Sequence, residues 1–341
     1  MHAPASEPAA VVRTALRRAL GPGRWWVLWA GLLLLPASAG AQLSGDLRRG
    51  QYGLLSGTQP AAGLLLTPWL YDLYSSTLVG PDGSRVQTNG ASTNTLTVPG
   101  LSVWLVTPWE ILGASFGVQL QLWGTMPSFD FPRLGATSTS YGFGDMYLKP
   151  VELGWHTTYV DVIAGFALWI PTGRYSPGAA DNTGQGQWGY EVSAGATLWF
   201  DAGHHFNLAL QALYDLYSPR RGAVMVGSTS TQLQTGNILY LQGGLGYSLL
   251  GGVVVIGVPY FVQLKVTEDT LPSGIGSVLP GIQAAKSWSI GLGAEIDLAW
   301  TDGDAIGFRW VQGFSGVNTT NGASFLISYT HAFNCFGREL Y

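Results

Sequence analysis

The sequence has little charge, few lysines and a single cysteine. Asp, Glu, Lys and Arg make up 11% of the 341 residues, whereas soluble domains carry about 25%. The only lysines are Lys149, Lys265 and Lys286, and the formal net charge is −4, so we expect no nucleic-acid partner. Because Cys335 is the only cysteine, an intrachain disulfide framework and a cysteine-based zinc site are excluded.

What the sequence has instead is apolar side chains and glycine. Hydrophobic residues make up 47%, aromatic residues 12%, and 48 residues are glycine. This apolar content argues against intrinsic disorder, and the glycines lack the period of three that collagen requires. The one stretch of the mature chain long, apolar and uncharged enough to be tested as a membrane-spanning helix, residues 243–262, holds six glycines and Pro259. Since Gly251-Gly252 near its middle is a hairpin signal, it predicts two strands, with a membrane-spanning helix as the alternative.

The first 41 residues have the features of an export signal. Four arginines precede an apolar run at residues 25–35, and Ala39-Gly40-Ala41 fits the small-residue rule for cleavage. The run is too short for a spanning helix, which needs about 20 apolar residues, although an uncleaved anchor helix is the alternative. We expect residues 1–41 to be a signal peptide and residues 42–341 to form one mature domain. That domain carries 12 basic and 19 acidic residues.

The mature chain alternates between apolar and polar residues with a period of two. In residues 206–217, Phe, Leu and Tyr alternate with Asn, Gln and Asp, and residues 190–200 and 288–300 follow the same pattern. A transmembrane barrel strand needs this arrangement, because lipid covers one face and the lumen the other. Trp288 and Trp300 are twelve residues apart, which is roughly 40 Å of strand, close to the separation of two aromatic girdles when the strand is tilted.

The alternation predicts an all-β fold, a transmembrane antiparallel up-and-down β-barrel of about twelve strands, in the outer membrane of a Gram-negative bacterium. Short connections are expected after the even-numbered strands, at 108–110, 154–158, 202–203, 251–252 and 302–304, and mostly longer ones after the odd-numbered strands. This is the alternation of periplasmic turns and extracellular loops, with both termini in the periplasm. The expected strands are 63–75, 94–107, 111–124, 142–153, 159–170, 188–200, 205–217, 237–249, 253–266, 287–300, 305–313 and 323–333.

If the apolar faces look outward, the charged residues of these strands point into the lumen, because an unpaired charge in hydrocarbon is costly. They form either a polar, slightly cation-favouring passage or a network of ion pairs that fills a small barrel. These lumen candidates are Asp145, Lys149, Asp161, Glu191, Asp215, Lys265, Glu295, Asp297 and Arg309.

Aromatic residues fall on both faces. Trp169, Trp199 and Tyr217 have inward parity, where they either stack with an aromatic solute or pack the interior. The outward ones are expected to form the membrane girdle in contact with outer-membrane lipids. These are Tyr190, Phe200, Phe206, Trp288 and Trp300. Pro150 and Pro259 fall inside expected strands and should each mark a strand end, a bulge or an exposed edge.

Catalytic chemistry has little support in the sequence. A membrane-embedded hydrolase would need a serine, a histidine and an orienting acid on the lipid-facing surface. His331 has Ser324 and Ser328 nearby, but Ser328 lies on the opposite face and no orienting acid is apparent. We expect no catalytic residues, metal site or cofactor.

Several segments carry a family resemblance: 106–113, Gly142-Phe143-Gly144-Asp145 with Lys149-Pro150, Gly154-Trp155, and Pro171-Thr172-Gly173-Arg174-Tyr175. Together they resemble the outer-membrane family named after the meta-pathway of phenol degradation, whose members are called transporters. The resemblance covers about residues 62–333 and implies uptake of aromatic or other small hydrophobic compounds. Outer-membrane barrels also resemble this chain in ending on an aromatic residue, here Phe333, which is read by the barrel-assembly machinery. A closed structural barrel with a surface-interaction role is the alternative function.

Overall fold

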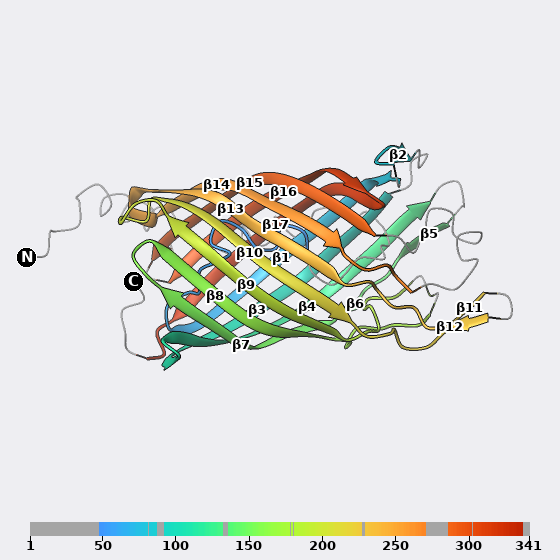
Figure 1. Cartoon of the computed structure of the whole chain (residues 1–341), viewed down its shortest axis with the longest axis horizontal. Helices are drawn as coiled ribbons and strands as arrows, with labels where there is room; N and C mark the ends of the chain where they lie inside the picture. The colour runs from blue at the N-terminus through green and yellow to red at the C-terminus, as the bar shows by residue number, and fades with distance from the viewer. Residues whose placement is uncertain are drawn as a thin grey trace, which may run out of the picture.

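The computed structural model describes residues 48–336, except 81, 87–91, 132–135, 178, 180, 227–228, 271–285 and 302. The expected signal peptide lies outside these residues. The chain forms a closed antiparallel β-barrel, in which each long strand pairs with its sequence neighbours and the last strand pairs with the first (Figure 1). The twelve-stranded up-and-down barrel predicted from the alternation is therefore confirmed.

Twelve long strands form the wall of the barrel. Their neighbours around the ring follow chain order, as antiparallel hairpins require. The strands are β1 (Gly63–Val79), β3 (Ser92–Ile111), β4 (Ala114–Phe131), β7 (Met146–His156), β8 (Val160–Ile170), β9 (Gly189–Trp199), β10 (Phe206–Tyr217), β13 (Ile238–Leu249), β14 (Val254–Lys265), β15 (Ser287–Thr301), β16 (Asp304–Val317) and β17 (Thr319–Phe333).

Along these strands many exposed side chains are apolar and many buried ones are polar, the reverse of a soluble protein. In β10, Leu210 is 43% exposed whereas its neighbour Gln211 is 1% exposed. The same inversion holds in β9, where Val192 is exposed and Glu191 buried. Outward apolar side chains meet lipid, so the sequence alternation sets which way each residue faces.

Two prolines alter the ladder where the sequence predicted an irregularity. Pro150 lies in a β-bulge of β7, between Leu148 and Val151 of the pairing with β8. The bulge inserts an extra residue and reverses the alternation beyond it. Pro259 pairs with Gly244 of β13 but has no partner on β15, where the ladder passes from Gly257 to Tyr260. Proline has no backbone N–H to donate, and Pro259 lies at a position of β14 that makes no ladder hydrogen bond to β15.

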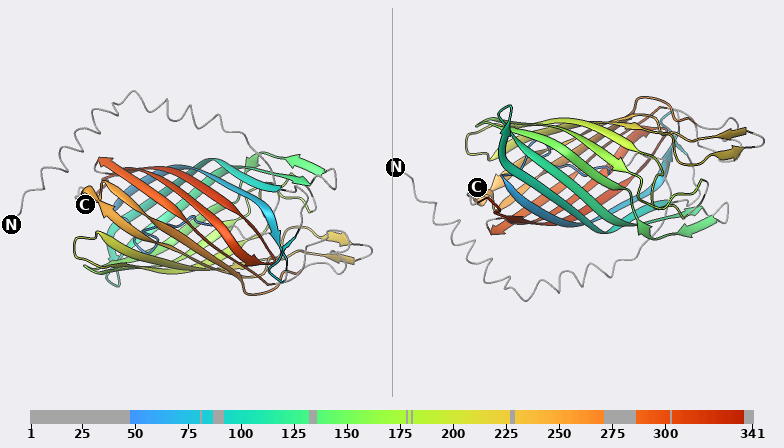
Figure 2. Two further views of the ribbon diagram at one scale, coloured as in Figure 1. Left: turned by 90° about the horizontal axis from the view of Figure 1, so that it is seen from above. Right: turned by 90° about the horizontal axis from the view of Figure 1, so that it is seen from below.

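Five short turns gather at one end of the barrel, called here the short-turn end. They include Leu112-Gly113, with φ of 54° and 74°, and the 3₁₀ turn η2 (Leu250–Gly252) between β13 and β14. The short strands β2 (Arg85–Val86), β5 (Ala136–Thr139), β6 (Gly142–Phe143), β11 (Val224–Val226) and β12 (Thr229–Thr231) belong to the connections of the opposite, long-loop end (Figures 1 and 2).

Two connections differ from the expectation. The turn predicted at 108–110 lies within β3, which continues to Ile111 through a bulge, so the hairpin turns at Leu112-Gly113. The longer connection expected between the last two strands is absent, because β16 and β17 both extend until Asn318 alone joins them. Asn318 has a φ of 49°, a backbone conformation that asparagine tolerates better than most residues.

The long apolar stretch at 243–262 forms β13 and β14, so the helix alternative is wrong. Among the described residues, no helix has the length and apolar character to cross a membrane.

Candidate functional site

Residues 48–62, called here the inner segment, lie inside the barrel. Arg49 hydrogen-bonds Gln263 of β14 through Nε (3.1 Å) and the Thr320 carbonyl of β17 through Nη1 (2.6 Å). Farther along, the Leu54 carbonyl accepts from Asn207 of β10, and Gln59 donates to the Glu152 carbonyl of β7 (3.3 Å). Because these strands stand around the ring, the segment crosses the lumen from the half near the long loops to the short-turn end.

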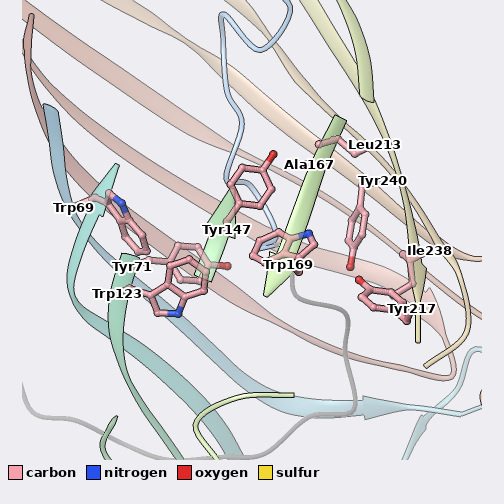
Figure 3. Close-up of a cluster of buried hydrophobic side chains, with 10 residues drawn as sticks. All are labelled: Trp69, Tyr71, Trp123, Tyr147, Ala167, Trp169, Leu213, Tyr217, Ile238 and Tyr240. Carbon is pink, nitrogen blue, oxygen red and sulfur yellow. The ribbon is translucent and has the colours of Figure 1, made fainter. Parts of the chain in front are cut away.

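Buried aromatic side chains cross the lumen beside the inner segment (Figure 3). The Trp69 and Trp123 ring centroids are 6.2 Å apart, those of Trp123 and Trp169 are 6.1 Å apart, and those of Trp169 and Tyr147 are 4.6 Å apart. Such tilted and edge-on pairs are the geometry that aromatic rings prefer. The cluster is completed by Tyr71, Ala167, Leu213, Tyr217, Ile238 and Tyr240.

Next to this row, a chain of charged and hydroxyl groups is fully buried. Lys149 Nζ is 2.9 Å from Glu152 Oε2, and the Tyr147 hydroxyl donates to Glu191 Oε1 at 2.8 Å. Lys149 and Glu152 share the lumen side because the bulge at Pro150 lies between them. Strict alternation would point Glu152 outward, so sequence reasoning missed it.

The other charged lumen candidates of the strands are also bonded or half-buried. Lys265 pairs with Asp269 (2.7 Å), Arg309 Nε donates to Glu295 Oε2 (2.7 Å), and Asp215 accepts from the Tyr217 hydroxyl (2.8 Å). Asp297 is half-buried on the same face of β15 as Glu295. Arg309 also donates to the carbonyls of Gly50 and Gln51, and so joins the wall to the inner segment.

Asp161 organises the lumen at the short-turn end. Its carboxylate contacts His156 Nδ1 at 3.2 Å and accepts from Trp199 Nε1 at 3.0 Å and from the Thr58 hydroxyl at 2.9 Å. Trp199 also stacks on His204, with ring centroids 4.3 Å apart. Trp199 thus binds a wall carboxylate, while Trp169 and Tyr217 belong to the buried aromatic cluster.

Asp145 is not part of the strand wall but clamps a long loop. Its Oδ1 accepts from the Gly173 amide (2.8 Å) and its Oδ2 from the Gln185 amide (2.5 Å). Thr172 supports the clamp by accepting from the Met146 amide and donating to the Gly144 carbonyl. Burial raises the pKa of Asp145 above its ordinary value, whereas the two amide bonds oppose the increase. The two sequence motifs, at residues 142–145 and 171–175, therefore meet in space.

Four of the five expected girdle residues are exposed on the outer face: Tyr190, Phe200, Phe206 and Trp288. The fifth, Trp300, is only 9% exposed. Its ring stacks on Tyr329 at a centroid distance of 6.3 Å, and a bulge between Ala299 and Thr301 disturbs the strand there. Trp300 therefore packs against the wall.

The expectation that His331 lacks an orienting acid is wrong. His331 Nδ1 lies 2.5 Å from Asp304 Oδ1, and Asp304 also accepts from the Tyr329 hydroxyl. The two partners come from adjacent strands, so their sequence separation hid the pair. Ser324 donates into the lumen, to the Arg49 carbonyl. Ser324 therefore lies away from this dyad and is not placed to act as its nucleophile.

The inner segment is the largest feature that the sequence analysis missed. Residues 48–62 show no period of two or of 3.6, and so predict neither a strand nor a helix. The adjacent Arg48-Arg49 pair, next to a membrane domain with few charges, was the available signal, because such charges need an aqueous or paired environment.

A family model described as "Putative MetA-pathway of phenol degradation" matches residues 75–329. The chain belongs to this family. No curated protein matches this chain at a significant level.

Solved structures share the fold of this family member. An outer membrane channel from Pseudomonas putida F1 superposes with a TM-score of 0.64 at 14% identity, covering 84% of this chain and 100% of that one. The transport unit of the autotransporter AIDA-I from Escherichia coli gives 0.50 at 9% identity, covering 80% and 91%. The chain thus has the β-barrel fold of Gram-negative outer-membrane proteins.

Proposed function

We propose that this barrel is a passage through which small aromatic or other hydrophobic compounds cross the outer membrane. The observation that carries the proposal is the row of buried rings from Trp69 to Trp169, which lies across the lumen. Aromatic faces offer a solute apolar contact and preferred stacking geometries without a fixed pattern of hydrogen bonds. The family description, which refers to phenol degradation, supports the same class of solute.

The inner segment is the element that controls this passage. It bonds to β7, β10, β14 and β17, and it occupies the space that a solute must cross. Its own backbone has no ladder partner, so it is held by side-chain contacts that can be exchanged one at a time. Insertion into lipid by the barrel-assembly machinery belongs to the same proposal, since β17 ends on the exposed Phe333.

The test uses the purified mature protein in planar lipid bilayers. Phenol and toluene are expected to reduce the ionic current in a concentration-dependent way, whereas glucose at the same concentration is not. Trp169→Ala should weaken the effect of the aromatic solutes, because it removes the ring at the centre of the row. The control is Trp155→Phe, at the end of β7 near the short turns.

A closed barrel with a structural or surface-interaction role is the second candidate, because the inner segment fills the lumen. An absence of current from the correctly folded, unchanged protein would favour it over transport.

A further inference from the structure

The side chain of Arg48 sits between two tryptophan rings. Its guanidinium carbon lies 3.9 Å from the ring centroid of Trp123 and 4.4 Å from that of Trp69, and Tyr71 lies 5.9 Å away. A cation over the face of a ring is attracted by the ring's negative quadrupole, most strongly for tryptophan. Two tryptophans on one cation form an aromatic cage, defined here as Trp69, Tyr71 and Trp123.

The wall of the barrel fixes both tryptophans in place. A Cβ atom added at Gly100 would lie 2.3 Å from the Trp69 ring, and one added at Gly144 would lie 2.0 Å from Trp123 Nε1. Each ring is therefore packed directly on backbone. The cage is a property of the strands and does not depend on Arg48 to shape it.

The charges of the lumen favour a cation at this point. Among the described residues of the long strands, the acids at the lumen outnumber the bases. The acids are Glu152, Asp161, Glu191, Asp215, Glu295 and Asp297, and the bases are Lys149, Lys265 and Arg309. Arg48 and Arg49 of the inner segment offset this excess. If the segment moves, the wall is left with uncompensated negative charge.

We propose that the cage of Trp69, Tyr71 and Trp123 is a binding site for a small organic cation, a guanidinium or quaternary ammonium compound, which Arg48 occupies in this structure. Arg48 is half-buried whereas its neighbour Arg49 is buried, so Arg48 is the more readily exchanged of the two. Organic cations are thus a second class of ligand, beside the aromatic and hydrophobic solutes proposed above. The proposal concerns binding to the cage alone, so its test does not depend on whether the barrel transports solutes.

Isothermal titration calorimetry of the full mature protein in detergent tests this site. The probes are methylguanidinium, choline and 3,3-dimethylbutan-1-ol, the uncharged carbon isostere of choline. In Arg48→Ala the cage is vacant, so both cations should bind at least about tenfold more tightly than to the unchanged protein. The isostere should bind at least about tenfold more weakly than choline, because it lacks the charge that the rings attract.

A second pair of variants locates the binding. Adding Trp123→Leu to Arg48→Ala keeps an apolar side chain but removes the ring, and should weaken choline binding at least about tenfold. Adding Trp155→Leu, remote from the cage, should leave it unchanged. If the first double variant does not fold, Trp123→Phe replaces it, with intermediate affinity expected. The proposal is overturned if Arg48→Ala binds cations no more tightly, if the isostere binds equally well, or if changing Trp123 has no effect.

Discussion

Lys149 and Glu152 place opposite charges in the same buried part of the lumen, next to Glu191 and Tyr147. Removing water from ions costs several kcal/mol each, and the attraction between partners offsets this only while both are present. The four side chains are therefore stable together, and the loss of one of them leaves a buried charge unpaired, which lowers the free energy of unfolding.

Lys149→Met should destabilise the barrel by about 3 kcal/mol, because it leaves Glu152 and Glu191 buried without their cation. The double variant Lys149→Met with Glu152→Gln should recover part of the loss. Urea unfolding of the protein in lipid vesicles measures both. Equal stability of the single variant and the unchanged protein would contradict the buried pair.

Asp201 controls the turn between β9 and β10 and makes it pH-dependent. The side-chain bond from His205 lowers the pKa of Asp201, and amides of the turn assist. A lowered pKa means that the ionised carboxylate supports the folded turn above the ordinary value of about 4, and that this support is lost as the pH falls through the lowered pKa.

Asp201→Ala should therefore speed amide exchange at His205 and Phe206 at neutral pH, and should make no difference at a pH below the lowered pKa. Hydrogen exchange followed by mass spectrometry measures it, with Asp82→Ala in a remote loop as the control. A difference that persists unchanged in strong acid would argue against a role for the carboxylate.

At the scale of elements, the seam between β1 and β17 closes the barrel and requires close backbone contact. A Cβ added at Gly322 would lie 1.8 Å from the Tyr74 carbonyl oxygen, whereas one at Gly313 on the neighbouring strand would meet its nearest atom at 3.4 Å. Contacts below 3.0 Å force the backbone to move. Gly322 therefore has no room for a side chain whereas Gly313 has, and Gly313 serves as the control for a substitution at Gly322.

Gly322→Ala should reduce the yield of closed barrel and Gly313→Ala should not. The measurement is the shift in electrophoretic mobility between heated and unheated samples in SDS, which folded barrels show. If both variants form equal amounts of closed barrel, the backbone at Gly322 and Tyr74 does not need to be this close for closure.

The carboxylate of Asp145 binds both sides of the loop of residues 171–188, through the amides of Gly173 and Gln185. Asp145→Ala should release the loop and speed cleavage by trypsin after Arg174. Asp181→Ala is the matched control, since it removes the surface ion pair with Arg174 but leaves the clamp intact. Unchanged cleavage of the Asp145 variant would show that other contacts hold the loop.

At the scale of the whole molecule, the alternation of the sequence predicted the barrel, its strand number and the inward position of Glu191, Asp215 and Glu295. It failed where the backbone departs from a period of two. The bulge at Pro150 turned Glu152 inward, and Asp145 lies before β7 begins. The inner segment has no periodicity, because its shape follows from the lumen around it. The period of a sequence carries no information about such long-range contacts.

Deleting residues 48–59 should raise the single-channel conductance several-fold and shift the reversal potential towards cation selectivity. The deletion removes both the obstruction and the two arginines that offset the acidic wall. Bilayer recordings under a salt gradient measure the two effects. The control is the double variant Arg85→Ala with Arg174→Ala, which likewise removes two positive charges, from the long-loop end. A conductance that stays the same would contradict the placement of this segment in the ion path.

The contacts of Arg49 also constrain the order of assembly. Its guanidinium binds Thr320, and its carbonyl accepts from Ser324, both on the final strand. One of the first described residues thus depends on some of the last to be synthesised, 271 and 275 positions later. These two contacts of the amino-terminal stretch can form only once the carboxyl-terminal strand is in place. The inner segment therefore completes its contacts only when the circumference of the pore is sealed.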